Sequence, residues 1–230
     1  MLKNYGKFIV IEGIDGSGKK TQLDRLANYF NDRGVETEKF DFPQYDRPSS
    51  YFVKKYLNGE YGGIEDVSSY QASIFYALDR FDIKQRIQKT LKLGKIVISN
   101  RYVASNMAHQ GSKIDDFKER KKYFEWVNTL EYDILGIPRP DLNLVLMVSS
   151  DLVQNLVAKK GARNYVKDKS GMDAHESNLS HLKRSESIYR ELIERFPDQF
   201  KEVECVANQK LLSIDEISKK LITIVNEIIK

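Results

Sequence analysis

The chain has 230 residues, 41% of them hydrophobic, which is enough apolar material for one sizeable domain. Its 37 basic residues nearly balance 33 acidic ones, so the net charge of +4 argues against a general binder of nucleic acid or membranes. The only cysteine, Cys205, excludes an intrachain disulfide, and no apolar run approaches the roughly 20 residues that span a bilayer, so we expect a cytoplasmic protein.

The most informative stretch lies near the start, KFIVIEGIDGSGKKT at residues 7–21. An apolar run at 8–11 predicts a buried strand, and it leads into a glycine-rich turn of the G-x-x-x-x-G-K type. Glycines let such a turn aim successive backbone N–H groups at phosphate oxygens, and the helix expected from Lys19 adds its dipole. The pattern predicts a nucleoside triphosphate site at Gly13, Gly16, Ser17, Gly18, Lys19, Lys20 and Thr21.

The next segments alternate between helical and extended patterns. Apolar spacing predicts a helix that ends near Gly34, a strand at 35–42, a turn at Phe42 and Pro43, and a short helix at 51–57. A longer helical pattern covers 67–93. Its expected buried stripe consists of Ile74, Leu78, Phe81, Ile87 and Leu91.

The second half continues this alternation. Strands are expected at 95–99, 142–148 and 201–206, and helices at 116–130, 150–160, 173–196 and 213–229. The basic, glycine-flanked stretch GARNYVKDKSG interrupts the pattern and is interpreted as a lid over about 158–174. Strands alternating with helices predict a three-layer α/β/α sandwich around a five-stranded parallel sheet.

Several short motifs together carry a family resemblance. They are IEGIDGSGKKTQ, Phe42-Pro43, YALDR ending at Arg80, NRY from Asn100, HQG from His109, PRPDL, and the basic stretch before DAHE. In this order, and over most of the chain, the set resembles the thymidylate kinase family. The resemblance implies a P-loop kinase fold, one domain over 1–230 with a basic lid, and ATP-dependent phosphorylation of dTMP to dTDP. It also implies Mg²⁺ with ATP, and a homodimer formed through the helices at 67–93 and 116–130.

The resemblance also implies roles for single residues. Asp15 would accept a hydrogen bond from the acceptor's 3′-hydroxyl, Arg101 would grip the acceptor phosphate, and Arg163 in the lid would neutralise charge between the phosphates. Tyr76 and Arg80, four residues apart on one helical face, would contact the base or phosphate, and Gln110 would read the pyrimidine edge. Structural alternatives stand beside these roles. They are loop capping for Asp15, core packing for Tyr76, a surface salt bridge for Arg101 and an ordinary loop position for Gln110.

Three positions depart from the family pattern. The hydroxyl that usually follows the lysine is replaced by Lys20, and the acidic residue usually found before the strand-end arginine is Asn100. No metal ligand is therefore assigned, and one hypothesis is that Lys20 replaces part of the ion's charge. Tyr45 stands where the family places an arginine after the proline, so Arg47 is a candidate for the acceptor phosphate.

Two other functions remain as alternatives. A deoxynucleoside kinase of similar fold would need a carboxylate beside a 5′-hydroxyl, and Glu12 is the only tempting candidate. A nucleotide-binding regulatory protein with weak or no turnover would fit Lys20 and Asn100, but it would not need a basic lid.

Overall fold

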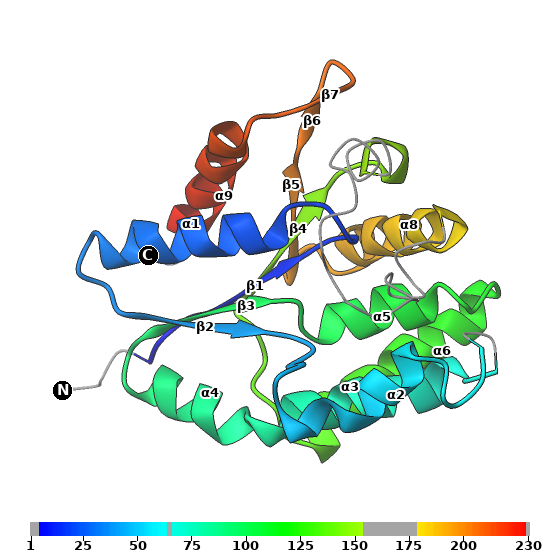
Figure 1. Ribbon diagram of the computed structural model, residues 1–230. Helices are drawn as coiled ribbons and strands as arrows, with labels where there is room; N and C mark the ends of the chain where they lie inside the picture. The colour runs from blue at the N-terminus through cyan, green and yellow to red at the C-terminus, as the bar shows by residue number, and fades with distance from the viewer. Residues whose placement is uncertain (1–4, 64–65, 154–178, 229–230) are drawn as a thin grey trace.

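The protein is described here from a computed structural model, which describes residues 5–63, 66–153 and 179–228. Its central sheet contains the strands β1 (Phe8–Glu12), β2 (Thr37–Asp41), β3 (Ile96–Asn100), β4 (Leu142–Met147) and β5 (Phe200–Glu204). All neighbouring strands are parallel, in the order β2-β3-β1-β4-β5 (Figure 1). The expected five-stranded parallel sheet is confirmed, and each strand lies within two residues of its predicted position.

Helices cover both faces of this sheet. On one face lie α1 (Lys19–Asn31) and α9 (Ile214–Ile228); on the other lie α4 (Lys84–Lys92) and α5 (Val103–Gly111), with α8 (Leu179–Arg195) beside α5 (Figure 1). A second group of helices packs outside α5. It comprises η1 (Pro48–Ser50), α2 (Tyr51–Leu57), α3 (Ser69–Asp82), α6 (Phe117–Asn128) and the π-helical η2 (Thr129–Ile134).

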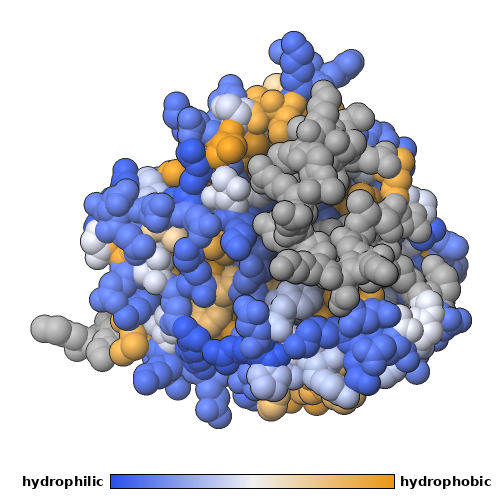
Figure 2. Space-filling model, viewed as in Figure 1, coloured by the Kyte–Doolittle hydropathy of each residue, from blue (hydrophilic) through white to orange (hydrophobic). Residues whose placement is uncertain are grey.

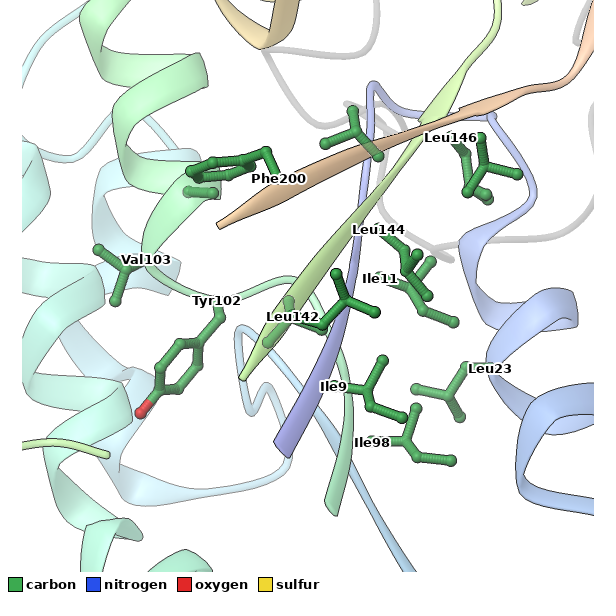
Figure 3. Packing of buried hydrophobic residues seen from close by; sticks show 14 of the residues in the cluster. Ile9, Ile11, Leu23, Ile98, Tyr102, Val103, Leu142, Leu144, Leu146 and Phe200 are labelled. Carbon is green, nitrogen blue, oxygen red and sulfur yellow. The ribbon is translucent and has the colours of Figure 1, made fainter. Parts of the chain in front are cut away.

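The core follows from the apolar runs of the central strands. Every residue of β1 and of β4 is buried, as expected for parallel strands covered on both faces. Ile9 and Ile11 point toward α1, where Leu23 meets them, whereas Tyr102 and Val103 fill the opposite face (Figure 3). Burying one such side chain is worth about 1.5 to 3 kcal/mol, so this packing holds the helices against both faces of the sheet.

The helical pattern over 67–93 is two helices, not one. They are α3 and α4, which meet at Ile83. The expected stripe is only half right, because Ile74, Leu78 and Phe81 are 40%, 41% and 40% exposed, whereas Ile87 and Leu91 are buried. In α3 the small residues face inward instead, and Ala72, Ser73 and Ala77 are fully buried.

Other elements were not expected or cannot be compared. The sequence analysis missed α5 and the two-stranded β6 (Val206–Ala207) and β7 (Lys210–Leu211). The helix expected at 150–160 is helical over 150–153; its remainder, the lid at about 158–174 and residues 173–178 of the next helix lie outside the described residues. None of the helices in the described segments combines the length and the apolar character needed to cross a bilayer.

Candidate active site

The glycine-rich loop connects the buried β1 to the start of α1. Gly13 has φ 137°, and a Cβ at this position would lie 2.8 Å from the backbone oxygen of Leu146, so the loop geometry requires glycine there. Gly18 precedes α1 with φ 92° and gives it no side-chain cap. No side chain of Gly18 occupies the first backbone N–H groups of α1. A helix N-terminus of this kind favours phosphate binding.

Lys19 folds back on this loop. Its Nζ donates hydrogen bonds to the backbone oxygens of Gly13 (3.1 Å) and Ile14 (2.8 Å), and the residue is only 7% exposed. Burial lowers the pKa of Lys19 to about 7, and the neighbouring Arg101 guanidinium adds to this effect. The Oγ of Ser17 in the same loop is buried and has no hydrogen-bond partner within the described residues. The loop thus holds an ammonium and a hydroxyl that a polyphosphate can engage.

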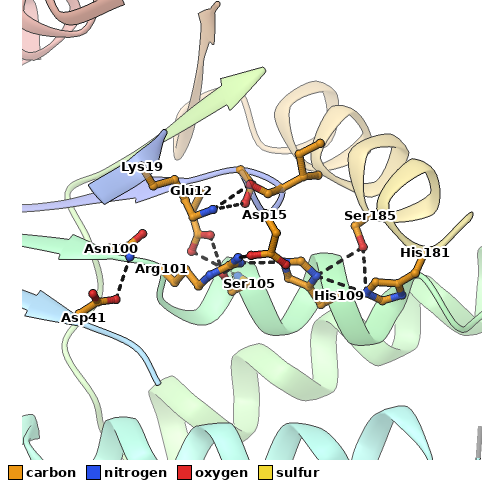
Figure 4. Close-up of polar contacts among 12 residues, drawn as sticks. Glu12, Asp15, Lys19, Asp41, Asn100, Arg101, Ser105, His109, His181 and Ser185 are labelled. Atoms are coloured by element: carbon orange, nitrogen blue, oxygen red, sulfur yellow. Dashed lines mark hydrogen bonds and ion pairs between the residues drawn. The ribbon is translucent and has the colours of Figure 1, made fainter. Parts of the chain in front are cut away.

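Arg101 follows β3 directly and faces the loop. Its backbone has φ 65°, a left-handed conformation that costs a non-glycine residue about 1 to 2 kcal/mol. Its Nη2 pairs with Oδ1 of Asp15, and its Nη1 contacts Nε2 of His109 at 2.7 Å and Oγ of Ser105 at 3.2 Å (Figure 4). The planar fork is therefore fixed from two sides in front of the glycine-rich loop.

A cavity of about 270 Å³ opens where β1, β2 and β3 end. This is the edge of a parallel sheet at which ligand crevices form. The structure brings many of the predicted substrate residues to its wall, namely Asp15, Phe42, Pro43, Tyr76, Arg80, Arg101 and Gln110. The other wall residues are Asp41, Tyr45, Asn100, Ser105, Asn106 and His109.

Arg80 reaches this wall with most of its guanidinium already engaged. Its Nε and Nη2 donate to the two carboxylate oxygens of Glu131 at 2.5 and 2.6 Å, and the exposed fractions of the two side chains are 2% and 0%. Asn106 also donates to Glu131, at 2.9 Å. The remaining nitrogen, Nη1, can donate a hydrogen bond to a ligand. Sequence reasoning missed Glu131, which lies 51 residues away in η2.

The turn after β2 is held by Asp79, the residue before Arg80. Asp79 is 1% exposed and accepts hydrogen bonds from the backbone N–H of Gln44 (2.8 Å) and from Oγ of Ser49 (2.6 Å). The YALDR segment therefore positions the Phe42-Pro43 turn as well as the arginine. Sequence reasoning assigned no role to Asp79; its position directly before the predicted site arginine Arg80 was the available signal.

Gln110 lies near the end of α5, with its side chain buried. The residue is 1% exposed, its backbone oxygen accepts from Oγ of Ser69 at 2.8 Å, and its Oε1 lies 3.5 Å from Oη of Tyr56. Its place in the cavity wall fits a residue that reads a base edge, because an amide offers both a donor and an acceptor.

Of the predicted substrate residues in the described part of the chain, one is not brought to the cavity. Arg47 is absent from the wall; its Nη1 lies 3.7 Å from Asp82, and the two side chains are 44% and 48% exposed. Arg47 ends a turn over residues 44–47, in which its backbone N–H donates a hydrogen bond to the backbone oxygen of Gln44 at 2.8 Å. The acceptor-phosphate role of Arg47 stays a prediction. Arg163 falls outside the described residues.

Glu12, the candidate base of a nucleoside kinase, is committed to the fold. It is fully buried and accepts from the backbone N–H groups of Tyr102 (2.8 Å) and Ser105 (3.2 Å). Its other oxygen accepts from the hydroxyls of Ser105 (2.7 Å) and Tyr189 (2.8 Å). The carboxylate thus caps the start of α5. Both of its oxygens are engaged by the protein, so it is not placed to act on a substrate hydroxyl.

Two histidines extend the contacts of Arg101 toward α8. Nδ1 of His109 lies 3.4 Å from Nε2 of His181 and 3.5 Å from Oγ of Ser185 (Figure 4). Burial lowers the pKa of His181 to about 4, so this ring is neutral at physiological pH. The pair packs behind the guanidinium and connects it to the helix that follows the expected lid.

Asp41 and Asn100 end neighbouring strands, and their side chains meet. Nδ2 of Asn100 donates to Oδ1 of Asp41 at 2.8 Å, and burial raises the pKa of Asp41. Oδ1 of Asn100 is buried and lacks a hydrogen-bond partner in the described part of the chain. Over that same part, no three or more His, Cys, Asp or Glu side chains are grouped as a metal site.

Comparisons with known proteins agree with this geometry. A family model described as thymidylate kinase matches residues 11–216. The thymidylate kinase of Mycobacterium tuberculosis is 30% identical over 185 residues, which cover 80% of this chain and 84% of that protein. A probable thymidylate kinase of Thermococcus gammatolerans is 30% identical over 226 residues, covering 96% of this chain and 97% of that protein.

The fold is also similar to a solved structure. A thymidylate kinase from Candida albicans aligns with a TM-score of 0.72 at 21% sequence identity, over 97% of this chain and 92% of that one. At this identity the likeness concerns the fold. It matches the five parallel strands and the helices that flank them.

Proposed function

This chain belongs to the thymidylate kinase family and phosphorylates dTMP to dTDP with ATP as donor, and we propose how the residues of its cavity divide that task. The observation that carries the proposal is the ion pair of Asp15 and Arg101, because it joins the glycine-rich loop to the wall of the cavity. A phosphate that reaches Arg101 therefore lies beside a phosphate held by the loop. Such juxtaposition is what phosphoryl transfer chiefly requires.

The donor triphosphate would lie in the loop, with its β- and γ-phosphates over the uncapped start of α1. Gly13, Gly16, Gly18 and Thr21 would contribute backbone N–H groups or a hydroxyl, together with Ser17. Lys19 would turn its Nζ from the carbonyls of Gly13 and Ile14 to the phosphates. Mg²⁺ is part of the proposal, because a divalent ion neutralises charge on the donor; the oxygens of Asp41 and Asn100 fit it.

The acceptor dTMP would occupy the cavity. Tyr76 offers an aromatic face for the base, Gln110 an amide for its polar edge, and Phe42 with Pro43 the apolar wall near the sugar. Asp15 would accept a hydrogen bond from the 3′-hydroxyl. Arg101 would bind the phosphate through its fork, and Nη1 of Arg80 would support it.

Transfer then needs no covalent intermediate on the protein. An anionic oxygen of the dTMP phosphate attacks the γ-phosphorus of ATP, a new P–O bond forms, and the bond from the γ-phosphorus to the bridging oxygen breaks to release ADP. Lys19, Arg101 and, from the lid, Arg163 would stabilise the charge on the transferring group. No strong base is required, because the attacking oxygen is already ionised.

We also propose a homodimer formed through the exposed face of α3. Tyr70, Ile74, Leu78 and Phe81 follow one another at helical spacing and are 38% to 41% exposed. Apolar atoms are visible at the lower edge of the molecule, beneath α2 and α3 (Figure 2). A contiguous apolar face of this kind favours a protein partner, and a second copy would cover it. The proposal keeps one domain with a lid at about 158–174 and a cytoplasmic location.

The proposal is tested by incubating the protein with ATP, Mg²⁺ and one acceptor at a time. We expect ADP and dTDP from dTMP, and no turnover with thymidine. Turnover with thymidine would instead favour a nucleoside kinase. Binding of ATP without turnover of either acceptor would favour a regulatory protein.

A further inference from the structure

Three carboxylates lie near the phosphate loop, and two of them are already committed. Glu12 is fully buried and accepts hydrogen bonds from two backbone N–H groups and two hydroxyls. Asp15 pairs with Arg101. Neither can turn toward a cation without breaking contacts that hold α5 or the acceptor arginine. The third carboxylate, Asp41, is differently placed.

Asp41 is the last residue of β2 and stands opposite Asn100, the last residue of β3, in the parallel register. Both line the cavity. Within the described residues Asp41 has no ion-pair partner, and the side-chain bond from Asn100 at 2.8 Å engages one of its two oxygens. The second oxygen remains for a ligand in the cavity.

Asn100 has a further side-chain oxygen beside this carboxylate. Its Nδ2 is used to orient Asp41, so its Oδ1 points to the other side (Figure 4). This oxygen is buried and lacks a partner among the described residues. A buried acceptor without a donor costs about 1 to 3 kcal/mol, and a hydrated cation or its water would remove that cost.

These donors match the chemistry of magnesium. Mg²⁺ takes oxygen ligands, keeps several waters, and is bound beside phosphates through one or two carboxylates. Burial raises the pKa of Asp41, and the positive charges of Lys20, Arg101 and Lys19 oppose this shift, as the charge of a bound cation would. Lys20 itself makes no ion pair with Asp41 in the described structure, so the carboxylate is not closed off by that ammonium.

We propose that Asp41, oriented by Asn100, is the carboxylate that holds the hydrated Mg²⁺ of the donor nucleotide in this chain. The inference rests on the proposed donor site and adds to it a residue that the sequence analysis did not consider. It places the acid at the end of β2, one strand away from the position where the family resemblance leads one to look. Lys20 then supplements the ion and does not replace it.

The test measures binding and not turnover. Titration calorimetry gives the Kd of a non-hydrolysable ATP analogue in EDTA and in excess Mg²⁺, and the ratio of the two is the magnesium gain. Wild-type protein should show a clear gain. Asp41→Asn should reduce the gain by about 10- to 100-fold, while binding in EDTA stays equal or becomes tighter because a negative charge has been removed.

Two further variants sharpen the result. Asp24→Asn removes an equally charged carboxylate that pairs with Lys39 outside the cavity, and should keep the wild-type gain. The exchange variant Asp41→Asn/Asn100→Asp keeps the charge and swaps the two positions. It should recover most of the magnesium gain. An exchange variant that stays at the Asp41→Asn level would contradict the pairing of the two side chains around one ion.

The other outcomes are equally decisive. A wild-type gain that survives in Asp41→Asn would overturn the inference but leave the donor site intact. Tight analogue binding without any magnesium gain in the wild type would also overturn it, and would favour Lys20 as a substitute for the ion. Failure of the wild type to bind the analogue under either condition would remove the donor site itself, and the inference with it.

Discussion

Asp15 in the phosphate loop and Arg101 after β3 form an ion pair, although 86 residues separate them in the chain. The two side chains are 22% and 14% exposed, so the pair is largely shielded from water. His109 and Ser105 hold the second arm of the same guanidinium. The arginine is thus oriented before a nucleotide enters, and orientation in advance lowers the cost of binding its phosphate.

Replacing this fork should impair catalysis more than folding. We expect Arg101→Lys to lower kcat/KM for dTMP by about 100-fold or more, because a lysine cannot bind a phosphate through two parallel N–H groups. Steady-state kinetics measure the effect. Arg139→Lys, which changes an exposed arginine paired with Asp133, is the matched control and should behave as the wild type. Equal rates for the two variants would remove Arg101 from the site.

The lowered pKa of Lys19 predicts proton uptake on ATP binding. Its value of about 7 means that most Lys19 side chains are neutral at pH 8, and the bound triphosphate should raise the pKa. Affinity for ATP should therefore fall as pH rises above 7, and should gain little from this group below pH 7. Calorimetry in buffers of different ionisation enthalpy should show uptake of close to one proton at pH 8.

The variant Lys19→Met separates this lysine from other groups. It should bind ATP more weakly and lose the proton uptake at pH 8. Uptake of the same size in Lys19→Met would mean that another group titrates.

The buried pair of Arg80 and Glu131 should matter for stability. Glu131→Gln leaves the arginine as an uncompensated charge in the core and should lower the free energy of unfolding by about 3 to 5 kcal/mol. Asp133→Asn, in the exposed pair with Arg139, should cost about 1 kcal/mol or less. Urea unfolding measures both. Similar losses of unfolding free energy for the two variants would show that the buried pair contributes no more to stability than the exposed one.

The exposed face of α3 gives a prediction about assembly. Sedimentation velocity should find a dimer for the wild type and a monomer for Ile74→Glu/Leu78→Glu, because two charges in an apolar interface oppose association. Leu93→Glu, at a 54% exposed leucine beyond α4, should remain dimeric. A double variant that stays dimeric would place the interface elsewhere.

The sheet and the phosphate loop could be predicted because their signals are local. An apolar run such as 8–11 fits a strand buried on both faces, and the glycine spacing of the loop that follows is a motif of consecutive residues. The family motifs likewise located the residues of the cavity wall. Each of these features depends on a few consecutive residues.

The remaining features depend on contacts between distant segments. Periodicity places Ile74, Leu78 and Phe81 on one face of a helix, but it cannot tell whether that face meets the core or another copy. The partner of Arg80 could not be predicted, because Glu131 lies in another helix. α5 escaped notice because buried Asn106 and Gln110 interrupt its apolar pattern, and tertiary hydrogen bonds satisfy them.

A crystal structure with dTMP and a non-hydrolysable ATP analogue tests the central claim most directly, that one cavity brings two anionic nucleotides together. The account predicts the dTMP phosphate on the guanidinium of Arg101, the donor phosphates in the loop from Gly13 to Lys19, and Nζ of Lys19 turned from the loop carbonyls to the phosphates. A dTMP phosphate bound away from Arg101, or a donor bound outside that loop, would contradict it.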